Sequence, residues 1–339
     1  MNTSPAAESD SDSPVALVES TRGNLVESVH FGSYSVVDST GKPLLAGGTP
    51  AKPMYARSSL KPLQSVAMVR AGLDLPDDLL ALSAASHSGA GKHQEGAQRI
   101  LALHGLDQAA LRNVVDLPYG VAEREAWLRG GGVATQLAQN CSGKHAAMLA
   151  TCVINGWTLD DYLAPEHPLQ KHVEATLNEL TGESAAASTV DGCGTPLFAY
   201  SLNGLARSYA MLAAAATGTP EWRVVTAMRS HPDMVAGEGR DVTLLTRLVP
   251  DLFAKDGAEA VQLVGLRPGV GIAVKISDGY DRARLPITLR LLEAMGIPSE
   301  LLQELPNPAI LGGGRAVGEL RATESVIKQL RPMAAGSAK

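Results

Sequence analysis

A serine and a lysine stand three residues apart in the segment ARSSLKPLQS, residues 56–65. Side chains three positions apart share one face of a helix, so the Ser58 hydroxyl would lie near the Lys61 amine. Pro62 is tolerated in a first helical turn, and we therefore expect the helix to begin close to Ser58–Ser59. Burial and the helix dipole both disfavour an ammonium group at this place. The spacing thus fits a serine nucleophile with its own base.

This spacing is not specific when it is taken alone. It recurs at Ser39–Lys42, in a turn-rich segment, and at Ser325–Lys328, in the polar C-terminal segment. A serine is also a common helix cap, in which case Lys61 would be an ordinary solvated lysine. The other reactive residues of the chain have to be considered together with this pair.

A second reactive cluster lies in NCSGKHAAML, residues 140–149. Cys141, Lys144 and His145 fall within the first turn of an expected helix, where backbone N–H groups favour an anion. A cysteine there would have a lowered pKa, which suits a nucleophile or a metal ligand. A helix cap with a buried thiol explains the same residues without chemistry, and Cys152 is expected to be such a buried cysteine.

A third cluster lies in TVDGCGTPLF, residues 189–198. Asp191 and Cys193 belong to a tight glycine-rich loop, and glycines let the backbone approach a ligand closely. Asp191 would bind an ammonium group or orient a lysine. An ordinary Asp-Gly turn is the alternative interpretation.

A second serine and a second lysine lie far apart in the chain. Ser86 and His87 follow an apolar segment in ASHSG, and Lys275 alternates with Val and Ile in VKISDG. Lys275 points away from the apolar face of its expected strand, a position that usually marks a solvent-facing lysine. His87 is equally explained as a loop histidine.

Strand-like segments lie at both ends of the chain and enclose a helical middle. Residues 15–46 and the alternating residues 270–276 have strand patterns, and residues 315–322 fit a further strand. Apolar residues recur every three or four positions from residue 60 to residue 249 and again over 285–296, which indicates helices. We expect an α/β fold of the α+β kind, in which one antiparallel sheet from both chain ends is covered by a helical lobe.

Length and composition limit the class of protein. Of the 339 residues, 45% are hydrophobic and 19% charged, which is enough for a large core. We expect a disordered tail over residues 1–14, a single domain over residues 15–330 and a flexible tail over residues 331–339.

Several partner classes are not expected. The formal net charge of -6 offers no basic surface for nucleic acid. No apolar run approaches the roughly 20 residues that cross a bilayer, and no glycine-rich phosphate loop follows an expected strand. Three cysteines are too few for a disulfide framework, and the polar N-terminus lacks the pattern of a secretory signal. We therefore expect a cytoplasmic protein that acts on a small molecule, with no nucleic acid or membrane partner.

Taken together and in this order, these clusters resemble one family, the rhizobial-type (thermolabile, class 3) L-asparaginases with their asparaginase II domain. The matching segments extend over nearly the whole chain between the tails, and NCSGKH combined with DGCG is the most specific part. The segments are TRGNLVES (21–28), ARSSLKPLQ (56–64), ASHSG (85–89), NCSGKHAAMLA (140–150), HPLQ (167–170), DGCGTP (191–196), HPDMVAGEGR (231–240) and VKISDG (274–279).

The resemblance implies a serine-β-lactamase-like or glutaminase-like fold, with the active site between the sheet and the helical lobe. It implies two serine–lysine pairs, a zinc site and several groups that bind the substrate; enzymes of this fold class often form homodimers, which we also expect here. The implied residues are the catalytic pairs Ser58 with Lys61 and Ser86 with Lys275, the zinc ligands Cys141, Lys144 and Cys193, and the substrate-binding residues Arg57, Asp191 and His145.

The resulting hypothesis is hydrolysis of L-asparagine to ammonia and L-aspartate through an ester on Ser58. Lys61 would receive the serine proton, while Ser86 and Lys275 would pass the second proton and activate water; the opposite division between the pairs is equally open. Two lysines close together would each disfavour the charged form of the other. We expect the zinc to position the substrate, because the serines already supply the nucleophile.

Three alternatives stay open. A glutaminase differs by one methylene in the substrate, which is worth only about 1–3 kcal/mol of discrimination. A penicillin-binding or β-lactamase-type enzyme would also carry Ser-Asp-Asn and Lys-Thr-Gly, and neither tripeptide occurs in the sequence. A non-catalytic amino-acid-binding protein would bind asparagine without releasing ammonia.

Overall fold

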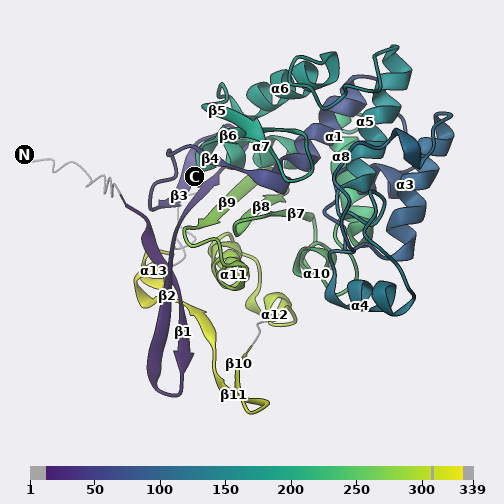
Figure 1. Ribbon diagram of the computed structural model, residues 1–339. Helices are drawn as coiled ribbons and strands as arrows, with labels where there is room; N and C mark the ends of the chain where they lie inside the picture. Colours follow the sequence, from purple (N-terminus) through teal and green to yellow (C-terminus); the bar gives the residue numbers. More distant parts are fainter. Residues whose placement is uncertain (1–12, 307–308, 331–339) are drawn as a thin grey trace, which may run out of the picture.

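The computed structural model describes residues 13–306 and 309–330 (Figure 1). The strands are β1 (Val15–Arg22), β2 (Leu25–Val37), β3 (Pro43–Gly47), β4 (Met54–Tyr55), β5 (Ala187–Val190), β6 (Pro196–Tyr200), β7 (Leu252–Gly257), β8 (Val261–Leu266), β9 (Val270–Ile276), β10 (Ile310–Gly312), β11 (Arg315–Gly318) and β12 (Leu320–Ala322). The α-helices are α1 (Lys61–Arg70), α2 (Asp77–Ser83), α3 (Gly91–Leu103), α4 (Val121–Arg129), α5 (Ser142–Asn155), α6 (Pro168–Thr181), α7 (Leu202–Ala213), α8 (Pro220–Ser230), α9 (Pro232–Val235), α10 (Asp241–Leu248), α11 (Arg284–Ala294), α12 (Ser299–Leu302) and α13 (Glu324–Gln329). Short 3-10 helices are η1 (Arg57–Leu60), η2 (Gln108–Ala110) and η3 (Asp281–Ala283).

Both ends of the chain contribute to one antiparallel sheet. Its strands follow the order β12-β1-β2-β9-β8-β7, and β3 pairs with β2 beside this path. The long strand β2 pairs with β1 along its first part and with β9 along its second part. The predicted α+β fold, with a sheet from both chain ends and a helical lobe, is confirmed.

Helices cover both faces of the sheet (Figure 1). On one face α7 packs against β2, β8 and β9, and it joins the core of the helical lobe. On the other face, α11 packs over β8 and β9, and the alternating residues Ile272, Val274 and Ile276 belong to that second core. Lys255 of β7 lies opposite Leu263 of β8, and Leu263 lies opposite Ala273 of β9. Because these three share a face and the two apolar ones belong to the lobe core, the Lys255 side chain points toward the helical lobe.

The sequence pattern missed two strands next to the site. All residues of β7 and of β8 are buried, so neither strand shows the alternation of apolar and polar residues that indicates a strand. The three-stranded sheet β4-β6-β5 within the helical middle was also missed, and the expected strand at 315–322 is two short strands, β11 and β12.

The predicted tails lie largely outside the described residues, since residues 1–12 and 331–339 are not among them. Within the described ranges, no helix combines the length and the apolar character needed to cross a bilayer.

Helices α2 and α5 meet at Gly143, directly beside the loops that carry Ser86 and Cys141. A Cβ atom on Gly143 would lie 2.5 Å from Leu82 Cγ and 2.6 Å from the Leu82 carbonyl oxygen. A side chain at this contact would therefore push the two helices apart.

We predict that Gly143→Ala lowers the free energy of unfolding by about 1–3 kcal/mol, the usual cost of overpacking. The matched control is Gly91→Ala in the first turn of α3, where the nearest atom to a new Cβ is 3.7 Å away. Urea unfolding of both variants measures the difference. Equal stabilities would show that the α2–α5 contact tolerates a side chain.

Candidate active site

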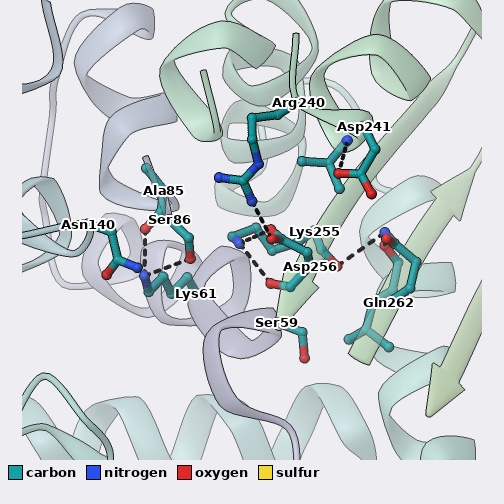
Figure 2. Close-up of polar contacts among 12 residues, drawn as sticks. Ser59, Lys61, Ala85, Ser86, Asn140, Arg240, Asp241, Lys255, Asp256 and Gln262 are labelled. Carbon is teal, nitrogen blue, oxygen red and sulfur yellow. Dashed lines mark hydrogen bonds and ion pairs between the residues drawn. The ribbon is translucent and has the colours of Figure 1, made fainter. Parts of the chain in front are cut away.

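The Lys61 side chain is buried at the start of α1, where 1% of the residue is exposed. Its Nζ donates to the Ala85 carbonyl oxygen at 2.7 Å, to Ser86 Oγ at 2.9 Å and to Cys141 Sγ at 2.9 Å. Three acceptors match the three N–H groups of an ammonium ion. Figure 2 shows the Lys61 amine reaching Ala85 and Ser86, which follow α2 in the chain.

The Ser58 hydroxyl makes no hydrogen bond to the Lys61 amine, although the Lys61 backbone N–H donates to the Ser58 carbonyl oxygen. Ser58 lies in η1, where Arg57 has a positive φ of 53°, and the α-helix begins at Lys61 rather than at Ser58–Ser59. Pro62 does occupy the first turn, as expected. The residue Ser58 is half-buried, and its hydroxyl makes no hydrogen bond within the described part of the chain. The Lys61 side chain turns away to Ser86 because three acceptors satisfy it there.

The expected pair of Ser86 with Lys275 needs correction, because the hydroxyl of Ser86 is bound by Lys61. Lys275 Nζ donates to the carbonyl oxygen of Glu259 at 2.6 Å and to that of Ile276. Lys275 does point away from the apolar face of β9, as predicted. Together with Arg57 and Glu259, it lines a surface pocket of about 380 Å³ beside η1.

The cysteines of the two predicted loops meet in a buried cluster. Lys144 Nζ donates to Cys193 Sγ at 3.1 Å and to Thr195 Oγ1 at 2.9 Å. A hydrogen bond from Cys141, together with the Lys144 charge, holds the pKa of Cys193 well below its ordinary value despite burial. The same hydrogen bond and burial raise the pKa of Cys141, so the expected lowered pKa belongs to Cys193 instead. Burial lowers the pKa of Lys144, but the two cysteine charges outweigh it and raise the pKa overall.

This cluster fits the ligand set that the resemblance implies for zinc. Two sulfur atoms and one amine converge from the start of α5 and from the loop between β5 and β6. In the ranges the structure describes, no three or more His, Cys, Asp or Glu side chains form a metal-binding group, so a site here depends on the lysine. Zinc binding would require Cys141 and Lys144 to lose their protons.

The predicted substrate-binding residues flank this cluster. Arg57 Nε donates to Asp191 Oδ1 at 2.8 Å, which ties η1 to the loop that carries Cys193. His145 Nδ1 lies 2.7 Å from the Tyr162 hydroxyl. Burial lowers the pKa of His145 to about 4, although the neighbouring Cys193 acts in the opposite direction. His145 is therefore neutral near pH 7.

A further lysine, Lys255 on β7, was missed by the sequence analysis. It is fully buried, and its Nζ donates to Asp256 Oδ1 at 2.6 Å and to the Asp256 carbonyl oxygen at 2.7 Å (Figure 2). Burial lowers the pKa of Lys255 to about 8; Asp256 opposes this shift and the nearby Lys61 charge adds to it. The useful signal in the sequence was a lysine in the middle of the apolar run LFAKDG, because a buried lysine needs partners.

The strand β7 lies directly against the segment that carries Ser58. A Cβ atom on Gly257, two residues after Lys255, would lie 2.7 Å from the Ala56 carbonyl oxygen and 3.2 Å from the Ser59 nitrogen. The strand that carries Lys255 is therefore in contact with the segment that carries Ser58.

Fold and site together define an α+β protein with buried lysines beside serine and cysteine side chains, between a sheet and a helical lobe. The sequence profile of the family L-asparaginase II matches residues 18–322. The chain therefore belongs to the L-asparaginase II family. No curated protein gave a significant match.

Among solved structures, the chain is similar to Mglu. The native form of Mglu in 4.3 M NaCl is 14% identical with a TM-score of 0.36, and the alignment covers 78% of this chain and 61% of that one. Another native-form structure is 15% identical with a TM-score of 0.38, covering 78% and 64% of the two chains. The chain thus spans about three fifths of the length of these structures, and the family assignment depends on the sequence profile alone.

Proposed function

We propose that this protein is an amidohydrolase that cleaves the side-chain amide of L-asparagine and releases ammonia and L-aspartate. The observation that carries the proposal is the 2.9 Å contact between the Ser86 hydroxyl and the buried amine of Lys61, the lysine three residues after Ser58. Serine–lysine sites recur among hydrolases as a variant of serine–histidine sites. Membership of the L-asparaginase II family supports chemistry on an amide.

Ser58 is the nucleophile in this proposal. The residue is half-buried and lies one 3-10 turn before Lys61. Attack on the amide carbon forms a C–O bond and breaks the C–N bond. The serine proton moves to Lys61 as Lys61 passes one of its own protons through Ser86 to the departing amide nitrogen, which leaves as ammonia. Water then cleaves the aspartyl ester and returns a proton to Ser58 by the same route.

Lys255 takes the role of second lysine that was first assigned to Lys275. A group whose pKa is about 8 exchanges protons near neutral pH and so can help to deprotonate the attacking water. The contacts of Lys275 direct it instead to the pocket beside Arg57, where two cations would attract the α-carboxylate of the substrate. Asp191 is the proposed partner of the α-ammonium group. His145 is completely buried. In this proposal it therefore acts on the site through its hydrogen bond with Cys193 and does not touch the substrate directly.

Cys141, Lys144 and Cys193 are the proposed zinc ligands. Zinc bound there would draw a substrate oxygen toward it and so hold the substrate in place. Cys141, one of these proposed ligands, accepts a hydrogen bond from the same Lys61 amine that contacts Ser86, which supports a positioning role for the ion. The cytoplasmic location and the homodimer stay predictions.

We predict that Ser58→Ala lowers kcat for ammonia release from L-asparagine by roughly 1,000-fold or more, because the nucleophile is removed. Ser325→Ala is the matched control, since this serine also precedes a lysine by three residues but lies exposed on α13. A coupled ammonia assay measures both variants. Unchanged activity in Ser58→Ala would exclude Ser58 as the nucleophile.

The same assay separates the alternative functions. The proposal expects a higher kcat/KM for L-asparagine than for L-glutamine and no cleavage of a chromogenic cephalosporin. A preference for glutamine would make the protein a glutaminase. Binding of asparagine without any release of ammonia by the wild-type protein would make it an amino-acid-binding protein.

Removal of zinc with a chelator is expected to raise KM for L-asparagine more than it lowers kcat, because a positioning ion mainly strengthens substrate binding. Steady-state kinetics before and after chelation, with zinc added back, measure the effect. An equal fall in kcat and kcat/KM would instead assign the ion to the chemical step.

A further inference from the structure

The segment HPDMVAGEGR has no role in the chemistry described so far, although its last residue reaches the site. Arg240 Nη2 donates to Asp256 Oδ2 at 2.7 Å, while Asp256 Oδ1 accepts from Lys255 at 2.6 Å (Figure 2). One carboxylate therefore joins an arginine ahead of α10 to the buried lysine of β7. The Arg240 guanidinium also lies over the Tyr119 ring, with 5.0 Å between Arg240 Cζ and the ring centroid.

The backbone of Lys255 is held as well as its side chain. Gln262 Nε2 donates to the Lys255 carbonyl oxygen at 3.3 Å, and the buried Arg284 donates to Gln262 Oε1. Arg284 Nη2 also donates to Asp241 Oδ2 at 2.7 Å. These contacts hold both the backbone and the amine of Lys255.

We propose that Asp256, itself fixed by Arg240, is a positioning residue that holds the Lys255 amine in the active site and controls when it releases its proton. The inference rests on the proposed function as far as Lys255 acts in catalysis. The inference also gives Arg240, the last residue of the segment HPDMVAGEGR, a role in the site.

The charges around Lys255 act in opposite directions. Burial and the Lys61 and Arg240 cations favour the neutral amine, whereas Asp256 favours the ammonium form. Burial raises the pKa of Asp256, but Lys255, Arg240 and Arg284 outweigh it and hold that pKa well below its usual range. Asp256 therefore carries its negative charge at neutral pH.

Two substitutions should therefore shift the same titration in opposite directions. Asp256→Asn removes the carboxylate that is hydrogen-bonded to Lys255, so the pKa of Lys255 should fall by about 1–3 units, the range a close opposite charge produces. Arg240→Gln removes a neighbouring cation and leaves the carboxylate, so the pKa should rise. An ion pair without a role in catalysis would shift the Lys255 titration but leave the pH dependence of kcat/KM unchanged.

The test is a pH titration of the lysine side chains by NMR on the full-length protein with 13C-labelled lysine. Lys255→Arg identifies the Lys255 signal, and the pH dependence of kcat/KM is measured on the same samples. Expected are a Lys255 signal and an acid limb that move to lower pH in Asp256→Asn and to higher pH in Arg240→Gln. Asp256→Glu should restore the wild-type values in part.

Glu221→Gln is the matched control, because the Arg70–Glu221 pair is similarly placed, with side chains 25% and 15% exposed against 19% and 12% for Arg240–Asp256. It should leave the Lys255 titration unchanged. A Lys255 titration that is unaltered in both test variants, or that shifts the same way in both, would overturn the inference. If Asp256→Asn does not fold, Arg240→Gln and Asp256→Glu still decide.

The two proposals fail in distinguishable ways. A wild-type protein that releases no ammonia contradicts the proposed function, while the NMR titration still tests the role of Asp256. Conversely, ammonia release with an unshifted Lys255 titration contradicts only the positioning role.

Discussion

The burial of the Lys61 amine is the constraint on which the rest of the site depends. An ammonium group inside a protein costs several kcal/mol unless it is paired and hydrogen-bonded, so the fold has to bring acceptors to it. Ala85 lies 24 residues and Cys141 80 residues further along the chain, yet both contact the same amine. The close approach of α1, α2 and α5 serves these contacts, and it also sets Ser86 beside the thiol cluster.

Three buried lysines, two in the helical lobe and one on β7 facing it, each have a different way of compensating their charge. Lys61 is satisfied by neutral acceptors and a thiol, Lys144 by the thiolate of Cys193, and Lys255 by Asp256. The outcome differs accordingly, because the pKa of Lys144 is raised while that of Lys255 is lowered to about 8. The strength of the neighbouring negative charge, set against burial, decides which amine binds a proton tightly and which exchanges it.

The sequence predicted the fold class and the loops of the site better than it predicted their contacts. Short polar segments with serine, cysteine or glycine at the start of a helix are visible as patterns, and Cys141 and Cys193 do meet. The partner of Ser86 was missed because spacing within a helix says nothing of contacts between helices, which placed Lys61 there. Lys255 was missed because every residue of β7 is buried. Such a strand shows no alternation of apolar and polar residues, so the sequence did not indicate which way the lysine side chain points.

The central claim is that the buried Lys61 amine activates the Ser58 hydroxyl. A rapid acid quench during turnover of L-asparagine, followed by peptide mass spectrometry, tests this claim most directly. The account predicts an aspartyl ester on the peptide that contains Ser58 in the wild-type protein, and its loss in Lys61→Met. An ester on the peptide that contains Ser86 would contradict the account, as would an ester on Ser58 that forms at an unchanged rate in Lys61→Met.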